Sequence, residues 1–192
     1  ADKNVVRDGG GNVTAKDIAY NVKIDAANGG RNYQLSDGMT TANAEDGLNM
    51  DAAGTISPRK ITLGFANVSK PYDTTAVNNT KNITSVTAGN SDGRGAAALA
   101  ADGITSASFN TAGVQSFYGA GNTDGTFVQN PNVVTDANGN VITNGKDVQY
   151  SNLANTLAAQ PYAGNYEVAD TAYGKGTIRK RTVTANDFSF SI

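Results

Sequence analysis

Oxygen-bearing side chains at the spacing of a calcium loop occur at residues 136–140, which read DANGN. Alternating carboxylate and amide oxygens open the helical calcium loop, but that loop also needs a bidentate glutamate further on, which this sequence lacks. An earlier segment, Asp8 to Asn12, keeps both ends of the pattern and has Gly10 in the middle. Asp, Asn and Gly in this order also close tight turns. We therefore expect hairpin turns and no metal, with a calcium loop as the alternative.

The acidic residues are candidates for acid and base catalysts. The chain has fifteen aspartates and two glutamates, Glu45 and Glu167. Glycosidases need two carboxyl groups with separated pKa values, whereas most of these aspartates stand beside Gly or Asn in expected turns. The chain contains no histidine and no cysteine, which excludes imidazole bases, thiolate nucleophiles, disulfides and the usual zinc ligands. We predict no catalytic residues, no enzyme activity and no cofactor.

Aromatic side chains offer a binding chemistry instead. Tyr and Phe rings stack on sugars when Asn or Asp side chains stand beside them, and they also fill cores. The candidates are Phe117, Tyr118, Tyr162, Tyr166 and Tyr173. Core and turn packing is the favoured interpretation of these residues, and a glycan-binding surface is the alternative.

The overall composition limits the partners and the fold class. The net charge is −2, and the lysines and arginines are scattered, so no basic face for nucleic acid is expected. No apolar run approaches the roughly 20 residues that span a bilayer, so we expect no membrane insertion. The 22 glycines, with abundant Asn, Asp and Thr, indicate a turn-rich β protein.

The stretch from Lys60 to Ala76 shows how these strands are built. Ile61, Leu63 and Phe65 alternate with polar residues, as in a half-buried strand, and Val68 extends the pattern. Lys70-Pro71-Tyr72-Asp73 then ends the strand, because proline lacks an amide hydrogen and Asp favours a turn. Similar segments are predicted at 60–68, 81–88, 104–109, 113–118, 126–128, 131–135, 140–143, 147–150, 165–169 and 175–178.

Strands at this spacing predict an all-β fold of antiparallel, sandwich-like repeat units in tandem. Two alanine- and leucine-rich segments, 95–101 and 152–159, are candidate helices of about two turns. A helix over 152–159 lying across a sheet would favour a β-grasp-like unit with one short helix, which is the alternative.

Many positions recur further along the chain in the same order. Residues 4–13 and 132–141 share seven identities at an offset of 128, from Asn4 and Asn132 to Val13 and Val141. Other matches follow at offsets of 130 (Lys16 and Lys146), 133 (Asn32 and Asn165) and 122 (Gly54 and Gly176). Changing offsets indicate loops of different length between related strands. We therefore predict the C-terminal half of one repeat at 1–57, a complete repeat at 58–180 and the first strand of the next at 181–192.

Three motifs carry a family resemblance. Lys70 to Ala76 (KPYDTTA), Gly164-Asn165-Tyr166, and Gly176-Thr177-Ile178 leading into Arg181 to Thr184 resemble the K-x-Y-D-G-T-T, G-N-Y and A-T-I-x-x-K-x-L-T signatures of YDG-type repeats. Such repeats occur in large secreted surface proteins of Gram-negative bacteria, including filamentous-haemagglutinin-like adhesins. Thr74 departs from the family glycine, which would favour a turn with positive φ.

The resemblance implies a non-catalytic module of an extracellular adhesin or fibre at the bacterial surface, used as a stalk or spacer and in attachment or biofilm cohesion. It implies structural roles for the motif residues Tyr72, Asp73, Thr74, Asn165 and Tyr166, and for Asn32 and Tyr33 of the preceding half. The expected partners are adjacent repeats, or neighbouring chains through strand pairing, since half-units leave sheet edges open. Host or matrix glycans are the alternative partners.

Overall fold

The computed structural model describes residues 2–121, 126–159, 161–184 and 187. The chain divides into two compact units, Ala1–Pro58 (unit 1) and Arg59–Ile192 (unit 2). Strands make up most of the regular structure, and the described residues contain one α-helix, so the predicted all-β class is confirmed.

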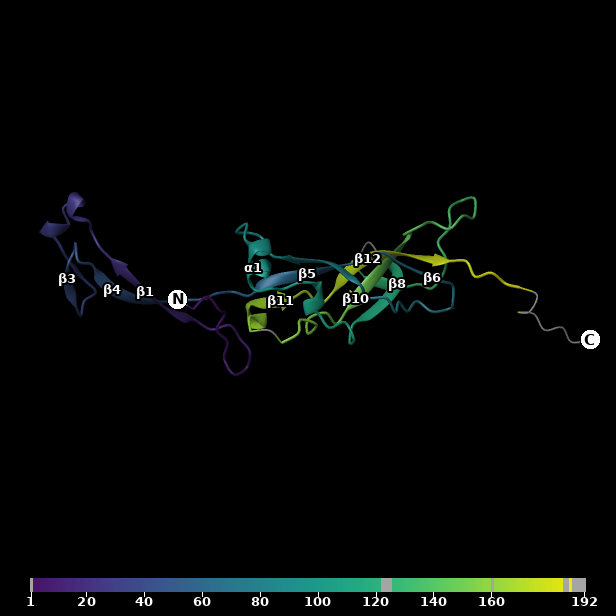
Figure 1. The fold of residues 1–192 in the computed structure, drawn as a ribbon, viewed down its shortest axis with the longest axis horizontal. Coiled ribbons are helices and arrows are strands. Elements are labelled where there is room, and N and C mark those ends of the chain that lie inside the picture. Colours follow the sequence, from purple (N-terminus) through teal and green to yellow (C-terminus); the bar gives the residue numbers. More distant parts are fainter. Residues whose placement is uncertain (1, 122–125, 160, 185–186, 188–192) are drawn as a thin grey trace, which may run out of the picture. The chain divides into compact units, whose positions relative to one another are not determined.

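Unit 2 contains a five-stranded sheet of order β6-β12-β10-β8-β9 and a three-stranded sheet of order β11-β5-β7 (Figure 1). Its strands are β5 (Arg59–Phe65), β6 (Val68–Pro71), β7 (Ile83–Ala88), β8 (Gln115–Gly121), β9 (Phe127–Gln129), β10 (Lys146–Ser151), β11 (Tyr166–Val168) and β12 (Ala172–Arg179). Its helical segments are α1 (Gly95–Ala101) and the 3-10 turns η3 (Ser106–Ser108) and η4 (Ala163–Asn165).

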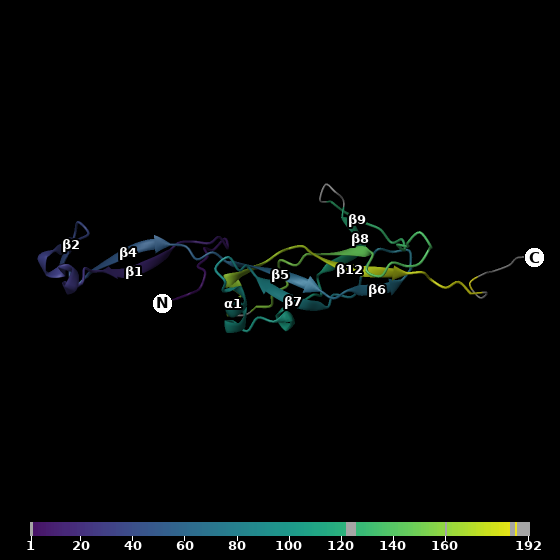
Figure 2. The same cartoon turned by 90° about the horizontal axis from the view of Figure 1, so that it is seen from above.

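Most strand pairs of unit 2 are antiparallel, and two are parallel. β11 pairs with β5, with Tyr166 opposite Arg59. β12 pairs with β6, with Arg179 opposite Pro71 (Figure 2). The first and last strand segments of the unit, 59–71 and 166–179, therefore run side by side in the same direction through both sheets. The chain enters unit 2 beside the start of β11 and leaves it at the far end of β12.

The predicted inward positions of the first strand segment form the core. Ile61, Leu63, Phe65 and Val68 are all buried, as the alternation predicted. The Phe65 ring stacks on the Tyr150 ring, with centroids 3.7 Å apart and planes 5° from parallel. Because β5 and β10 belong to different sheets, this stacked pair joins the two sheets in one hydrophobic core.

The helix predictions had different outcomes. The candidate at 95–101 is α1, which buries Leu99 and starts where the Asn90 side chain accepts a hydrogen bond from the Gly95 amide at 2.9 Å. The candidate at 152–159 was wrong. Asn152 has a φ of 62°, which ends the regular backbone, and Leu153 is fully buried in the core. The β-grasp alternative depended on this second helix.

Three of the predicted strands, 104–109, 131–135 and 140–143, form no strand in the structure. Residues 104–109 contain η3, and of this segment Phe109 alone forms a β-bridge, to Leu157. Residues 131–135 and 140–143 form a hairpin held by the single bridge between Thr135 and Val141. Tertiary packing decides the conformation of these short segments, because few of their backbone groups form hydrogen bonds of a β-ladder.

Unit 1 contains two two-stranded antiparallel sheets. The longer sheet pairs β1 (Lys16–Val22) with β4 (Leu48–Gly54), and the shorter pairs β2 (Gln34–Ser36) with β3 (Thr41–Asn43). The 3-10 turns η1 (Ala26–Asn28) and η2 (Gly30–Asn32) connect β1 to β2. A hairpin with a bridge between Arg7 and Val13 precedes β1.

The hairpins that match in sequence have the same backbone geometry. The Asp8 amide donates to the Asn12 carbonyl at 3.0 Å, and the Asp136 amide donates to the Asn140 carbonyl at 2.9 Å. The glycine of each turn has a positive φ, 83° at Gly11 and 81° at Gly139. Residues 8–12 and 136–140 therefore close the same kind of turn, which requires glycine at this position.

The strands after these hairpins match as well. Lys16 lies opposite Gly54 in unit 1, and Lys146 lies opposite Gly176 in unit 2. Tyr33 after η2 and Tyr166 after η4 have nearly equal backbone angles, with φ of −131° and −130° and ψ of 153° in both. The hairpins and the longer strand pairs therefore match between the units, whereas β2 pairs antiparallel with β3 and β11 pairs in parallel with β5. That unit 1 is half of a repeat and unit 2 a complete one stays a prediction.

The predicted first strand of a further repeat, 181–192, falls largely outside the described residues. Residues 181–184 are described and belong to no strand. Among the described residues, no helix has the length and hydropathy that crossing a bilayer requires.

Tyr20 and Tyr150, which match at the offset of 130, should contribute unequally to stability. Tyr150 is fully buried against Phe65, so Tyr150→Ala should lower the free energy of unfolding by about 3–5 kcal/mol. Tyr20, the matched residue of unit 1, is 44% exposed, so Tyr20→Ala should cost about 1 kcal/mol or less. Urea unfolding followed by circular dichroism measures both, and equal losses would contradict this assignment of the core.

Candidate functional site

The Lys70 to Thr75 segment forms a tight polar clamp after β6. The Lys70 ammonium donates to Asp73 Oδ1 and to the Thr75 carbonyl, both at 2.7 Å, and to Thr75 Oγ1 at 3.0 Å. Asp73 Oδ1 also accepts hydrogen bonds from the amide and the hydroxyl of Thr75, each at 3.0 Å. We call Lys70, Asp73 and Thr75 the turn clamp.

The turn clamp lowers the pKa of its carboxylate. Hydrogen bonding from Lys70, and then from the Thr75 amide, lowers the pKa of Asp73 to about 2. The Lys70 ammonium also lies 5.5 Å from the centroid of the Tyr118 ring, within the range of a cation–π contact. Burial raises the pKa of Tyr118 to about 12, so its phenol stays neutral. These groups contact one another, which suits a structural role for the turn clamp.

Thr74 has a positive φ, a conformation that glycine adopts readily. Its φ is 68°, a left-handed conformation that a β-branched residue adopts at a cost. Its hydroxyl donates to the Asp73 carbonyl at 2.6 Å. The hydrogen bonds of the turn clamp on either side of Thr74 therefore hold this left-handed conformation without a glycine.

Tyr166 and Asn165 lie elsewhere in unit 2, at the start of β11 in the three-stranded sheet. The Tyr166 ring is buried, and its hydroxyl donates to Asp102 Oδ2 at 3.0 Å. Burial, with the hydrogen bond to Asp102, raises the pKa of Tyr166 to about 12. The Asn165 amide donates to the Tyr162 carbonyl at 3.0 Å and so closes η4. The structure does not bring these residues together with the turn clamp, which follows β6 of the other sheet.

The remaining motif residues are also dispersed. Tyr72 is partly buried and packs on the core of unit 2, and its amide donates to the Arg179 carbonyl at 2.8 Å. Asn32 closes η2 in unit 1, and Tyr33 is 59% exposed. The motif therefore marks turns and strand ends in both units and does not assemble one site.

The candidate calcium loops use their carboxylates within the turn. Asp136 Oδ1 accepts hydrogen bonds from the amides of Asn138 and Asn140, at 2.9 and 2.8 Å. Asp136 Oδ2 accepts from the Asn140 side chain at 3.2 Å, and Asp8 and Asn12 make the equivalent contact at 3.1 Å. The part of the chain that the structure describes has no group of three or more Asp or Glu side chains placed to hold a metal. The geometry is that of an Asx turn.

The five aromatic residues predicted as sugar-stacking candidates separate by burial. Tyr118 and Tyr166 are buried in the core, Phe117 and Tyr162 are partly buried, and Tyr173 is 56% exposed. Tyr173 and Phe117 lie on the outer face of the five-stranded sheet, in one row with Gln149 between them, since Gln149 is opposite both. Phe127 from β9 completes this surface, with its ring centroid 6.2 Å from that of Tyr173.

We call Phe117, Phe127, Gln149 and Tyr173 the aromatic platform. Gln149 Nε2 donates to Tyr173 Oη at 3.1 Å, which orients the exposed phenol. The next row holds an ion pair between Lys175 and Asp147. Gly119 leaves room for Phe127, because a Cβ added there would meet the Phe127 ring at 2.6 Å. Flat aromatic faces beside an amide and a carboxylate suit the apolar faces and hydroxyl groups of a sugar.

Sequence reasoning missed Gln149 and Phe127 as members of this surface. The alternation in β10 carried part of the signal, since Val148 and Tyr150 point inward and Gln149 must then point outward. No local pattern places Phe127 on the same surface, because that depends on the pairing of β9 with β8.

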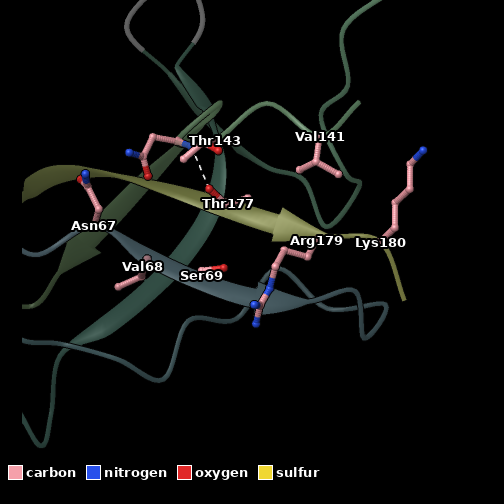
Figure 3. A pocket seen from close by; sticks show the side chains of 9 residues that line it. Asn67, Val68, Ser69, Val141, Thr143, Thr177, Arg179 and Lys180 are labelled. Atoms are coloured by element: carbon pink, nitrogen blue, oxygen red, sulfur yellow. Dashed lines mark hydrogen bonds between the residues drawn. The ribbon is translucent and has the colours of Figure 1, made fainter. Parts of the chain in front are cut away.

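A hollow of unit 2 lies between β6, β12 and the 141–144 loop, and measures about 580 Å³ (Figure 3). The side chains of Arg179 and Lys180 point to different sides of it. The Lys180 ammonium donates to the Gly139 carbonyl at 2.7 Å, and the Asn144 amide to Thr177 Oγ1 at 2.7 Å. Polar groups that do not converge on one point make this hollow a weaker candidate than the aromatic platform.

No protein-family model, curated protein or solved structure matches this chain.

The turn clamp yields a stability prediction. Thr74→Gly should raise the free energy of unfolding by about 0.5–1 kcal/mol, because glycine adopts a φ of 68° without the steric cost of a Cβ. Thr75→Gly is the matched control and should destabilise, because it removes hydroxyl contacts to Lys70 and Asp73. Urea titration compares the two variants, and a stabilising Thr75→Gly would refute the clamp.

The low pKa of Asp73 predicts a dependence of stability on acid. Its folded pKa of about 2 lies below the ordinary 3.8, so its contribution is full above about pH 4 and is lost as the pH falls toward 2. Asp73→Asn should therefore be less stable than the original chain at pH 6, and this difference should shrink from pH 4 to pH 2. Thermal melting across this range tests the sign, and a difference that grows in acid would contradict it.

Proposed function

We propose that this chain is a non-catalytic repeat module of a large extracellular bacterial adhesin or fibre, acting as a stalk or spacer. One observation carries the proposal: the first and last strand segments of unit 2 pair in parallel, from Arg59 opposite Tyr166 to Pro71 opposite Arg179. The chain therefore enters and leaves at opposite ends of the unit. Units joined in tandem then extend a fibre by one unit length each.

The internal duplication supports the same function. Equivalent hairpins, strand registers and tyrosine backbone angles recur in units 1 and 2, as repeated modules of one polypeptide would have. The motif residues support a structural role, because the turn clamp, Tyr72 and Tyr166 make contacts within their own unit. The resemblance to YDG-type repeats supports a location at the bacterial surface, with attachment and biofilm cohesion as the proposed use.

A spacer should lengthen in equal steps. Residues 59–71 span roughly 40 Å when extended, so chains with one, two and three copies of residues 59–180 should increase in maximum dimension by about that amount per copy. Small-angle X-ray scattering measures this dimension. A maximum dimension that increases only as it would for a compact sphere would contradict the proposal.

The location of the protein can be tested separately. Antibodies against this chain should label intact cells of the organism that produces it, with antibodies against a cytosolic protein as the negative control. Labelling that requires lysis of the cells would overturn the extracellular assignment while leaving the length measurement unaffected.

A glycan-binding module is the second candidate function, and the exposed aromatic platform favours it. Tyr173→Ala should then reduce glycan binding by about tenfold or more, because stacking on an exposed ring is lost. Tyr162→Ala is the matched control and should bind as the original chain does, since Tyr162 lies outside the platform. A glycan array followed by calorimetry tests this, and equal binding by all three chains would exclude the platform.

A further inference from the structure

The sheet of β1 and β4 in unit 1 has an exposed apolar face. Ile18, Tyr20 and Val22 alternate along β1 and therefore point to one side, and they are 47%, 44% and 38% exposed. Their direct partners on β4 are Ala52, Met50 and Leu48. These six side chains are apolar, apart from the Tyr20 hydroxyl, and Lys16 opposite Gly54 follows them at the end of the face. Leu48 is only 6% exposed and Met50 is partly buried, so β1 and Ala52 form most of the exposed area.

The opposite face of the same two strands is mostly polar. Asp17, Asn21, Asn49 and Asp51 point to that side, and the Asn21 side chain donates to Asn49 Oδ1 at 3.0 Å. A two-stranded sheet with one polar and one apolar face is more stable when another segment covers the apolar face. We call Ile18, Tyr20, Val22, Leu48, Met50 and Ala52 the open face.

The equivalent residues in unit 2 are completely covered. Val148 and Tyr150 match Ile18 and Tyr20 at the offset of 130, and both are 0% exposed. The strand registers also agree. Ile18 lies opposite Ala52, Val148 lies opposite Gly174, and Ala52 matches Gly174 at the offset of 122. One sequence pattern is therefore buried in unit 2 and exposed in unit 1.

Residues from the first half of unit 2 cover Tyr150. Phe65 stacks on Tyr150, and the Asn78 side chain donates to Tyr150 Oη at 3.4 Å. The strand edges are filled from the same half, since β10 and β12 lie between β8 and β6. In unit 1, the described residues place no further strand beside β1 or β4. Both edges and the open face thus lack what residues 59–121 supply in unit 2.

We propose that the open face binds a polypeptide segment with the sequence pattern of residues 59–121, supplied by another copy of the repeat. This partner adds a strand to each edge of the β1 and β4 sheet, and places an aromatic ring over Tyr20 and an amide near its hydroxyl. A second copy of the present chain is a poor donor, because its own residues 59–121 are held by residues 146–179. The inference depends on the repeat organisation of the proposed function and not on adhesion.

The test extends the full chain by a copy of the expected partner. Residues 59–128 are placed directly before Ala1, because Asn4 matches Asn132 at an offset of 128. Hydrogen–deuterium exchange is then measured by mass spectrometry on peptides that cover β1 and β4. Exchange of these amides should slow at least about 100-fold relative to the original chain, because strand pairing and apolar burial suppress local opening.

Two variants of the extended chain serve as controls. Phe65→Asp in the added copy alone should restore fast exchange in β1 and β4, since a carboxylate cannot stack on Tyr20. Tyr20→Asp with an unchanged added copy should do the same from the other side of the contact. The exchange of β10 and β12 in unit 2 should be unaltered in every chain, which separates loss of binding from general unfolding.

Several results would overturn the proposal. Exchange in β1 and β4 that is as fast in the extended chain as in the original excludes the partner. Slow exchange that survives both Asp variants shows a contact other than the open face. Light scattering that gives a dimer of the original chain, lost on Tyr20→Asp, assigns the face to a second copy instead. The length measurement on copies of residues 59–180 contains no unit 1, so it tests the proposed function independently.

Discussion

The parallel pairing of residues 59–71 with residues 166–179 is the constraint on which the rest of unit 2 depends. Each of these segments crosses from one sheet to the other, so their pairing holds the three-stranded and five-stranded sheets in a single register. Parallel pairs cannot be closed by a short turn, and the chain between them must return over a long path. That path supplies α1 and the antiparallel strands β7 to β10. The core then forms where the two sheets meet, with Phe65 stacked on Tyr150.

The motif residues stabilise the two ends of this parallel pairing. Lys70 and Asp73 fold the chain back directly after β6, and the Tyr72 amide extends the ladder to the Arg179 carbonyl. Tyr166 anchors the other end by burying its ring and bonding to Asp102. The Lys70 ammonium, the Asp73 carboxylate and the Tyr166 phenol, which would suggest chemistry in a sequence, therefore stabilise turns and strand ends. The exposed aromatic platform stands apart from them, on a sheet face that the core does not need.

Units 1 and 2 show how one pattern can have two environments. Tyr20 and Tyr150 occupy equivalent places in equivalent strand pairs, yet one is exposed and the other is fully buried. The local backbone does not change with this difference, since hairpin contacts and strand registers agree. Hydrophobic alternation specifies which face must be covered, and a separate segment determines whether it is.

The sequence alone determined the features that depend on neighbouring residues. Alternation at Ile61, Leu63 and Phe65 predicted the buried face, and alanine and leucine made residues 95–101 a candidate helix. The matched hairpins close the same turn in both units, and the repeat boundaries drawn from them stay a prediction. Tertiary structure decided the parallel pairing, the missing helix at 152–159, the left-handed Thr74 and the exposure of Tyr173 beside Phe127. These features arise from contacts between segments far apart in the chain, whose energies no local pattern records. The motif is a local pattern and was found from the sequence. The separate positions of its residues in the fold depend on distant contacts and could not be predicted.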